Sequence, residues 1–272
     1  MLNIVLVRAV SKVEGLQSLV DFVDRTRKSG KFSKHEPHVF LFAENHFQTN
    51  PAFKTQHHEN KPLVRALVKA LEGTEWHVAF AANEKYNRNV SNTGYFVSPT
   101  GYSALPKRLV PPGDEGNIRH ESQISKRGAD ELKGHWDVRT DELNKREFGR
   151  NFKQAEIGGH TVEFRVCADA REEKPANPNC LTLVSAEGLG KLKEHAQREI
   201  RARRSPFRLG NEIDDGIDVG TLPKTRGTVV VNDSISGLSL ILGEKKFDLL
   251  EQLKEANEAL KPKGISVDWH YF

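Results

Sequence analysis

Cys167 stands at the end of an alternating run of residues, a position in which its thiol could act as a nucleophile. Residues 161–167 (Thr-Val-Glu-Phe-Arg-Val-Cys) alternate between apolar and polar side chains, at the two-residue period of a β-strand, and a polar stretch follows. The reactive species is the thiolate, and a free thiol titrates near about 8.5, so a base must take the proton at neutral pH. A positive group must also stabilise the charge that develops on the attacked substrate. This chemistry therefore requires a carboxylate and a cation elsewhere in the chain.

Glu44 and Lys107 follow apolar runs in the same way. Glu44 ends the run 38–44, whose residues are apolar on both faces, and this pattern predicts a central strand that is covered from both sides. Lys107 follows a predicted strand hairpin at 92–105, which turns at a Pro-Thr-Gly sequence. Open α/β sheets have their binding sites at the carboxyl ends of the strands. The base and the cation that Cys167 requires are therefore both found where such a site is expected.

Each of these residues also has an ordinary structural interpretation when it is taken alone. Free cysteine is among the most buried residue types, so Cys167 alone would be read as a small core residue. Glu44 could cap a turn, and Lys107 is one of many lysines, most of which are solvated in a folded protein. The functional hypothesis depends on the three residues occurring together at strand ends of one strand–helix succession.

The order Glu44, Lys107, Cys167 resembles that of the nitrilase, or carbon–nitrogen hydrolase, superfamily. The Cys-x-Asp-x-Arg run at 167–171 is similar to the nucleophile segment of that family. The resemblance implies an α/β protein with a four-layer αββα sandwich, in which two mixed β-sheets are flanked by helices. It also implies that Glu44 is the general base, that Lys107 stabilises the tetrahedral intermediate and that Cys167 forms a thioester. This chemistry needs no metal and no organic cofactor.

The resemblance assigns supporting roles to Glu115 and Ala168. Glu115 follows Lys107 closely and would orient its ammonium and help to position the substrate. The backbone N–H of Ala168 would join that ammonium in stabilising the developing charge. The chain departs from the family pattern at two points: an alanine precedes Glu44 where proline is usual, and an alanine follows Cys167 where tyrosine is common.

The remaining patterns predict a single domain of residues 1–272 with a polar insert at about 111–154. Apolar runs predict strands at 2–10, 38–44, 76–82, 92–98, 161–167, 181–185, 228–231, 238–242 and 265–272, and helical spacing predicts helices at 13–28, 62–71, 190–204 and 247–260. The insert is rich in Gly, Asp, Glu, Lys and Arg, and long loops of this kind are typical of lids or binding elements. We therefore expect it to shape the mouth of the pocket.

The composition limits the partners and the compartment. The net charge of +4 comes from 41 basic and 37 acidic residues, a mixed surface that does not predict a nucleic-acid partner. Two cysteines cannot form a disulfide framework, and no run of about 18 apolar residues predicts a membrane span. We therefore expect a cytoplasmic protein. The resemblance adds a small-molecule amide or nitrile substrate, with the amide favoured, and a homo-oligomer.

Two alternatives remain at this point. A metal-dependent phosphodiesterase of similar sandwich fold would use Glu44 to hold a cation and would need an Asp–His pair near the C-terminus, for which Asp268 and His270 are the candidates. A non-catalytic nitrilase-like binding protein would keep the scaffold and use the basic cluster at 201–204 to contact phosphate groups. A charge run on a helix is more often a solvated face.

Overall fold

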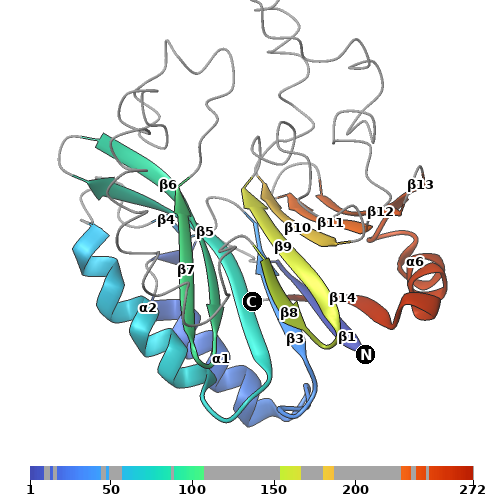
Figure 1. The fold of residues 1–272 in the computed structure, drawn as a ribbon, viewed down its shortest axis with the longest axis horizontal. Coiled ribbons are helices and arrows are strands. Elements are labelled where there is room, and N and C mark those ends of the chain that lie inside the picture. The colour runs from blue at the N-terminus through green and yellow to red at the C-terminus, as the bar shows by residue number, and fades with distance from the viewer. Residues whose placement is uncertain are drawn as a thin grey trace, which may run out of the picture.

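The structure, a computed structural model, consists of two β-sheets that lie face to face, with helices on the outer side of the larger one (Figure 1). The described residues are 1–8, 13–14, 17–43, 47–48, 57–86, 89–106, 154–166, 180–186, 228–233, 237–242 and 245–271. We name the eight-stranded sheet sheet A and the six-stranded sheet sheet B.

In sheet A, the strands that precede Glu44 and Lys107 end at the same edge. Its strands are β1 (Leu2–Arg8), β2 (Val13–Glu14), β3 (His38–Phe42), β4 (Phe47–Gln48), β5 (Trp76–Tyr86), β6 (Asn89–Ser98), β7 (Gly101–Pro106) and β14 (Ile265–Tyr271). The order is β14-β1-β3-β5-β4-β2, with β6 and β7 added beside β5. Strands β1, β3, β5 and β14 are parallel, and β6 is antiparallel to both β5 and β7. Strand β7 therefore points in the same direction as β3.

Sheet B is also mixed and has three parallel strands at its centre. Its strands are β8 (Gln154–Ile157), β9 (His160–Val166), β10 (Leu181–Ala186), β11 (Thr228–Asp233), β12 (Gly237–Leu242) and β13 (Lys245–Asp248), in the order β13-β12-β11-β10-β9-β8. Strands β9, β10 and β11 are parallel, whereas β8, β12 and β13 are each antiparallel to a neighbour. The strand that precedes Cys167 therefore points in the same direction as β10 and β11.

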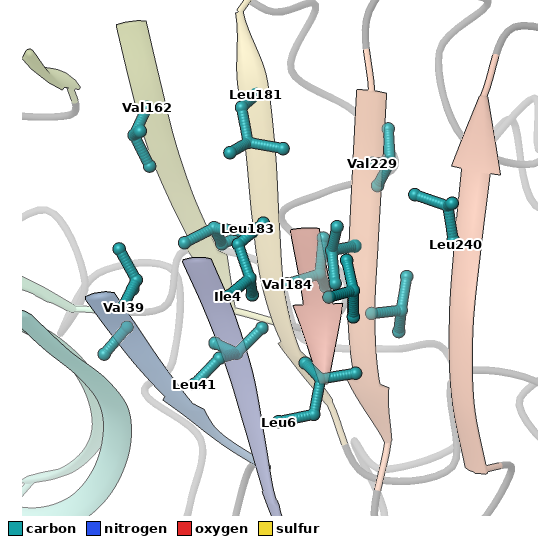
Figure 2. Packing of buried hydrophobic residues seen from close by; sticks show 14 of the residues in the cluster. Ile4, Leu6, Val39, Leu41, Val162, Leu181, Leu183, Val184, Val229 and Leu240 are labelled. Carbon is teal, nitrogen blue, oxygen red and sulfur yellow. The ribbon is translucent and has the colours of Figure 1, made fainter. Parts of the chain in front are cut away.

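The main core lies between the two sheets and follows from the alternation of side chains along the strands. From sheet A it receives Ile4, Leu6, Val39 and Leu41, and from sheet B it receives Val162, Leu181, Leu183 and Leu240, all fully or almost fully buried (Figure 2). Phe96 of sheet A also meets Phe164 of sheet B, with 6.2 Å between the ring centroids. The two sheets are thus packed directly against each other.

A second core lies between sheet A and the helices α1 (Gln17–Ser29) and α2 (His57–Leu71) (Figure 1). Phe22 of α1 meets Phe40 and Phe42 of β3 edge to face, with ring centroids 5.5 and 5.3 Å apart. Helix α6 (Leu253–Leu260) and the 3-10 turn η3 (Lys261–Lys263) precede β14, and α6 buries Ala256 and Leu260 in the main core. Because β3 has cores on both faces, it is a central strand, as its sequence predicts.

The predicted fold class, two mixed sheets in an α/β sandwich with helices outside, is confirmed, and several element bounds were wrong. The predicted helix 13–28 begins only at Gln17, because Val13–Glu14 pairs with β4 as a strand. The predicted helix 247–260 begins at Leu253, because Phe247 pairs with Leu240 in sheet B. The helix predicted at 190–204 and the insert up to residue 153 lie outside the described residues, while Gln154 begins β8.

Candidate functional site

All five predicted site residues, Glu44, Lys107, Glu115, Cys167 and Ala168, lie outside the described residues. The structure does describe the residues that immediately precede the three predicted catalytic ones. These are Ala43 after β3, Pro106 at the end of β7 and Val166 at the end of β9. Consecutive Cα atoms are about 3.8 Å apart. The three strand ends therefore mark the points from which the chain continues into the predicted catalytic residues.

Within sheet A, the chain leaves β3 and β7 at one edge and at a similar level. Pro106 lies in one row with Ala82 across β6. Leu41 pairs with the residue three positions before Ala82. Glu44 is likewise three positions after Leu41, and Lys107 is the residue after Pro106. Glu44 and Lys107 therefore follow strands that end at the same edge of the sheet and at a similar level, with β5 and β6 between them.

Within sheet B, the chain leaves β9 beside the carboxyl ends of β10 and β11. Val166 pairs with Ser185, and Ser185 pairs with Asn232. The three residues form one row across the sheet on its inner face, because they alternate with the same phase as Phe164, which meets sheet A. Cys167 follows Val166 directly. The predicted nucleophile is therefore the residue that follows β9 at the carboxyl edge of the parallel strands.

Three hydrogen bonds show that the carboxyl edges of the two sheets lie at the same end of the sandwich. The amide nitrogen Nδ2 of Asn232 donates to the backbone oxygens of Val7 and Leu41, at 3.0 and 2.7 Å. The guanidinium of Arg8 donates to the backbone oxygen of Asp233 at 3.0 Å. The ends of β1 and β3 are thus tied to the end of β11. The strands that lead to Glu44, Lys107 and Cys167 all end at this edge, at the top of Figure 1.

Asn232 and Ser185 are polar residues at this edge that the sequence analysis did not assign to the site. Both side chains are fully buried, and among the described residues neither Asn232 Oδ1 nor Ser185 Oγ has a hydrogen-bond partner. The sequence contained a signal for Asn232, because it shares the alternation of Thr228 and Val230 and so faces inward at the end of an apolar strand. The predicted strand at 228–231 instead ends one residue before Asn232.

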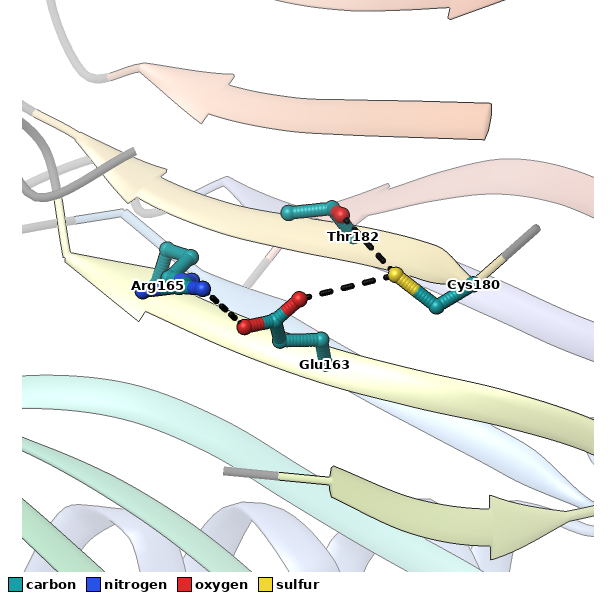
Figure 3. A network of polar contacts seen from close by, with 4 residues as sticks. All are labelled: Glu163, Arg165, Cys180 and Thr182. Carbon is teal, nitrogen blue, oxygen red and sulfur yellow. Dashed lines mark hydrogen bonds and ion pairs between the residues drawn. The ribbon is translucent and has the colours of Figure 1, made fainter. Parts of the chain in front are cut away.

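The other cysteine, Cys180, lies in a buried polar network on the outer face of sheet B (Figure 3). Its Sγ lies 3.5 Å from Glu163 Oε2 and 3.6 Å from Thr182 Oγ1, and the other oxygen of Glu163 forms an ion pair with Arg165. Burial raises the pKa of the Cys180 thiol, and the carboxylate of Glu163 adds to this increase. This thiol is therefore held in its neutral, unreactive form.

Asp268 and His270, the pair considered for a metal site, lie on the helix side of sheet A. They pair with Val5 and Val7, whose side chains belong to the core beneath α1. Nδ1 of His270 lies 3.2 Å from the ammonium of Lys31, an arrangement that disfavours a cation at this nitrogen. Asp268 accepts a hydrogen bond from the backbone N–H of Trp269 at 2.8 Å. Among the described residues, no group of three His, Cys, Asp or Glu side chains could hold a metal ion.

No protein-family model and no curated protein matches the chain. Solved structures that are similar to it include members of the nitrilase superfamily. A mutant form of an amidase of that superfamily from Nesterenkonia AN1 has 11% identity and a TM-score of 0.48, with 96% of each chain covered. A carbon–nitrogen hydrolase superfamily protein from Xanthomonas campestris has 13% identity and a TM-score of 0.47, with 95% of this chain and 96% of the other covered.

A glutamine-dependent NAD(+) synthetase from Cytophaga hutchinsonii is also similar, with 10% identity and a TM-score of 0.44. The similarity covers 85% of this chain and 37% of the synthetase. In the part of the chain that the structure describes, no helix has the length and apolar character needed to cross a membrane.

Proposed function

We propose that the protein is a thiol hydrolase that cleaves a non-peptide carbon–nitrogen bond, with Glu44, Lys107 and Cys167 as its catalytic residues. The observation that carries this proposal is the common direction of three strands. The strands preceding these residues all end at one edge of the sandwich, although they come from two different sheets. A carboxylate, an ammonium and a thiol that follow such strand ends are the groups that acyl transfer through a thioester requires.

In the first half-reaction, Glu44 takes the proton of the Cys167 thiol while the sulfur attacks the amide carbon. A carbon–sulfur bond forms, and the carbonyl oxygen of the substrate becomes a negatively charged oxygen. The ammonium of Lys107 and the backbone N–H of Ala168 stabilise this oxygen, while Glu115 orients the ammonium. The carbon–nitrogen bond then breaks, and protonated Glu44 gives its proton to the departing amine. The product of this half-reaction is a thioester on Cys167.

In the second half-reaction, water releases the acyl group. Glu44, again a carboxylate, takes a proton from the water as its oxygen attacks the thioester carbon. The carbon–sulfur bond breaks, the proton returns to the sulfur, and the products are a carboxylic acid and the free enzyme. A small-molecule amide is favoured over a nitrile, on the resemblance of the sequence to amidase-type members of the family.

The proposal is tested by intact-protein mass spectrometry with slow ester and amide substrates. Wild-type protein should gain the mass of one acyl group, and Cys167→Ala should gain none. Cys180→Ala is the matched control, since it removes the other thiol of the chain, and it should acylate like wild type. An acyl adduct that survives Cys167→Ala would contradict the assignment of the nucleophile.

A second measurement separates this mechanism from the phosphodiesterase alternative. Iodoacetamide should end amide hydrolysis by alkylating Cys167, and EDTA should leave the rate unchanged because the thioester chemistry uses no metal. Full sensitivity to EDTA together with indifference to alkylation would reject the proposal. Activity should then be measured with phosphodiesters, and Glu44 should be tested as a ligand of a bound cation.

A further inference from the structure

We propose that Asn232 is a positioning residue that holds the strand leading to Glu44 in register with the strand leading to Cys167. This inference rests on the proposed function. Asn232 is fully buried on the inner face of β11, and it is not adjacent in sequence to any predicted catalytic residue. Its effect on the reaction would be exerted through the placement of the two sheets.

The hydrogen bonds of Asn232 connect it to two central strands of the opposite sheet. Its Nδ2 carries two N–H donors, and these are used by the backbone oxygens of Val7, 3.0 Å away, and Leu41, 2.7 Å away. Val7 lies beside Phe42 in sheet A, so both acceptors are near the carboxyl ends of adjacent strands. One side chain therefore fixes the ends of β1 and β3 against the end of β11.

The same residue lies in the row that leads to the predicted nucleophile. Asn232 pairs with Ser185, and Ser185 pairs with Val166, the residue before Cys167. On the other side, Leu41 is three positions before Glu44, a separation that spans at most about 11 Å of extended chain. A shift of one sheet against the other would therefore change the distance between the carboxylate of Glu44 and the thiol of Cys167. Misplacement by about 1 Å can lower a rate about a hundredfold.

The polar side chain of Asn232 is fully buried at the end of an apolar strand, and this supports a role beyond packing. Among the described residues, Asn232 Oδ1 has no hydrogen-bond partner although it is buried. What the side chain provides is the link of its nitrogen to two backbone oxygens across the sheet interface.

Asn257 provides a matched control within the same protein. Its Nδ2 donates to the backbone oxygen of Val267, and its Oδ1 accepts from the backbone N–H of the same residue, both at 2.8 Å. These two bonds join α6 to the middle of β14, because Val267 pairs with Ile4 rather than with the end of β1. Asn257→Leu thus removes two hydrogen bonds to backbone, as Asn232→Leu does, without disturbing the carboxyl edge.

The experiment measures the rate at which iodoacetamide alkylates Cys167 across a pH series, in full-length protein carrying Cys180→Ala. This readout needs no knowledge of the substrate. If Asn232 contributed only to stability, its replacement would leave the alkylation profile of the folded protein unchanged. The parent protein should react at pH 7 faster than an ordinary thiol. In Asn232→Leu, Glu44 and Lys107 move away from the sulfur, so the profile should shift to that of a thiol titrating near about 8.5, with a roughly tenfold lower rate at pH 7.

Thermal melts and alkylation rates together decide the outcome. Asn257→Leu should melt earlier but keep the parent alkylation rate within about twofold. Asn232→Ser keeps one donor on a shorter side chain, so its alkylation rate should lie between those of the parent and Asn232→Leu. This variant replaces Asn232→Leu in the test if the leucine variant does not fold. The inference is overturned if the Asn232 variants keep the parent profile, or if Asn257→Leu loses reactivity equally. A parent protein in which Cys167 reacts as an ordinary thiol would reject the proposed function instead.

Discussion

At the scale of single residues, we predict that the two cysteines of the chain differ in reactivity. Cys167 follows a strand end at the shared carboxyl edge, whereas Cys180 is 1% exposed and lies against Glu163, which raises its pKa together with burial. We therefore predict that iodoacetamide at neutral pH modifies Cys167 in the native protein and modifies Cys180 only after denaturation. Peptide mass mapping checks this order. Modification of Cys180 in the native state at a comparable rate would contradict it.

The ion pair of Glu163 and Arg165 supports a second prediction, on stability. Both side chains are buried, at 0% and 6% exposure. Removal of one partner leaves the other charge buried without it, so Glu163→Leu should lower the free energy of unfolding by about 3–5 kcal/mol. The double variant Glu163→Leu/Arg165→Met should regain most of this loss, because no charge then remains buried. Urea unfolding measures both variants, and equal losses in the two would argue against the ion pair as the cause.

Lys107 supports a prediction that belongs to the proposed mechanism. If its ammonium stabilises the oxygen of the intermediate from one fixed position, the larger guanidinium of Lys107→Arg places its donors elsewhere. Loss of one such donor typically lowers the rate by about two to three orders of magnitude, so Lys107→Arg should be nearly as slow as Lys107→Ala. Steady-state rates on one amide test this. An arginine variant with more than about a tenth of the wild-type rate would require another role for Lys107.

At the scale of elements, the turn between β8 and β9 offers a test of how sheet B is seated on sheet A. Gly158 and Gly159 both have positive φ, at 56° and 79°. A Cβ on Gly158 would come within 2.9 Å of Pro37 Cγ, whereas a Cβ on Gly159 would meet nothing within 4 Å. Alanine at either position strains the backbone by about 1–2 kcal/mol, and Gly158→Ala adds a clash.

We therefore predict that Gly158→Ala lowers the midpoint of urea unfolding more than Gly159→Ala does. Leu2 and Pro37 lie at the amino ends of β1 and β3, so this turn is at the end of the sandwich opposite to the candidate site. Neither variant should change the alkylation rate of Cys167. Equal midpoints for the two variants would show that the contact with Pro37 is unimportant.

The long apolar elements could be predicted from the sequence, and the short ones could not. Strands β1, β3, β9 and β10 were found because several residues in succession alternate or are apolar on both faces. Strands β2 and β4 have two residues each, too few for any periodicity. Such strands exist because neighbouring strands supply hydrogen bonds, which a local pattern does not reveal.

The sequence could predict that the three proposed catalytic residues follow strands, but it could not predict what joins those strands. The sequence indicates that a Glu, a Lys and a Cys follow strands, and the sheet pairings now show that those strands end at one edge. The link between the sheets depends on Asn232 and two backbone oxygens that are 225 and 191 residues away in sequence. No spacing rule connects residues across two packed sheets, so this contact had to come from the structure.

At the scale of the whole molecule, stability depends on the core between the two sheets, and His77 makes this core sensitive to pH. The ring of His77 stacks on Phe96, with 5.8 Å between centroids, and Phe96 in turn meets Phe164 of sheet B. Burial lowers the pKa of His77 to about 4 from its ordinary value of 6.5. The imidazole is therefore neutral in the folded protein throughout the range from neutral to mildly acid pH.

The pKa of His77 gives the sign of the last prediction. Between pH 6.5 and about 4 the unfolded chain binds a proton that the folded protein excludes, so the free energy of unfolding should fall as the pH is lowered through this window. The largest contribution of this one group is roughly 3 kcal/mol. His77→Phe keeps an aromatic ring against Phe96 and removes the titration. Urea unfolding at a series of pH values should therefore show that the free energy of unfolding falls less steeply with acid in the variant than in wild type. The carboxylates and the more exposed His270 are present in both proteins, so their titration does not account for the difference. Parallel declines in the two proteins would mean that His77 is protonated in the folded state and that the sheet interface admits water at this point.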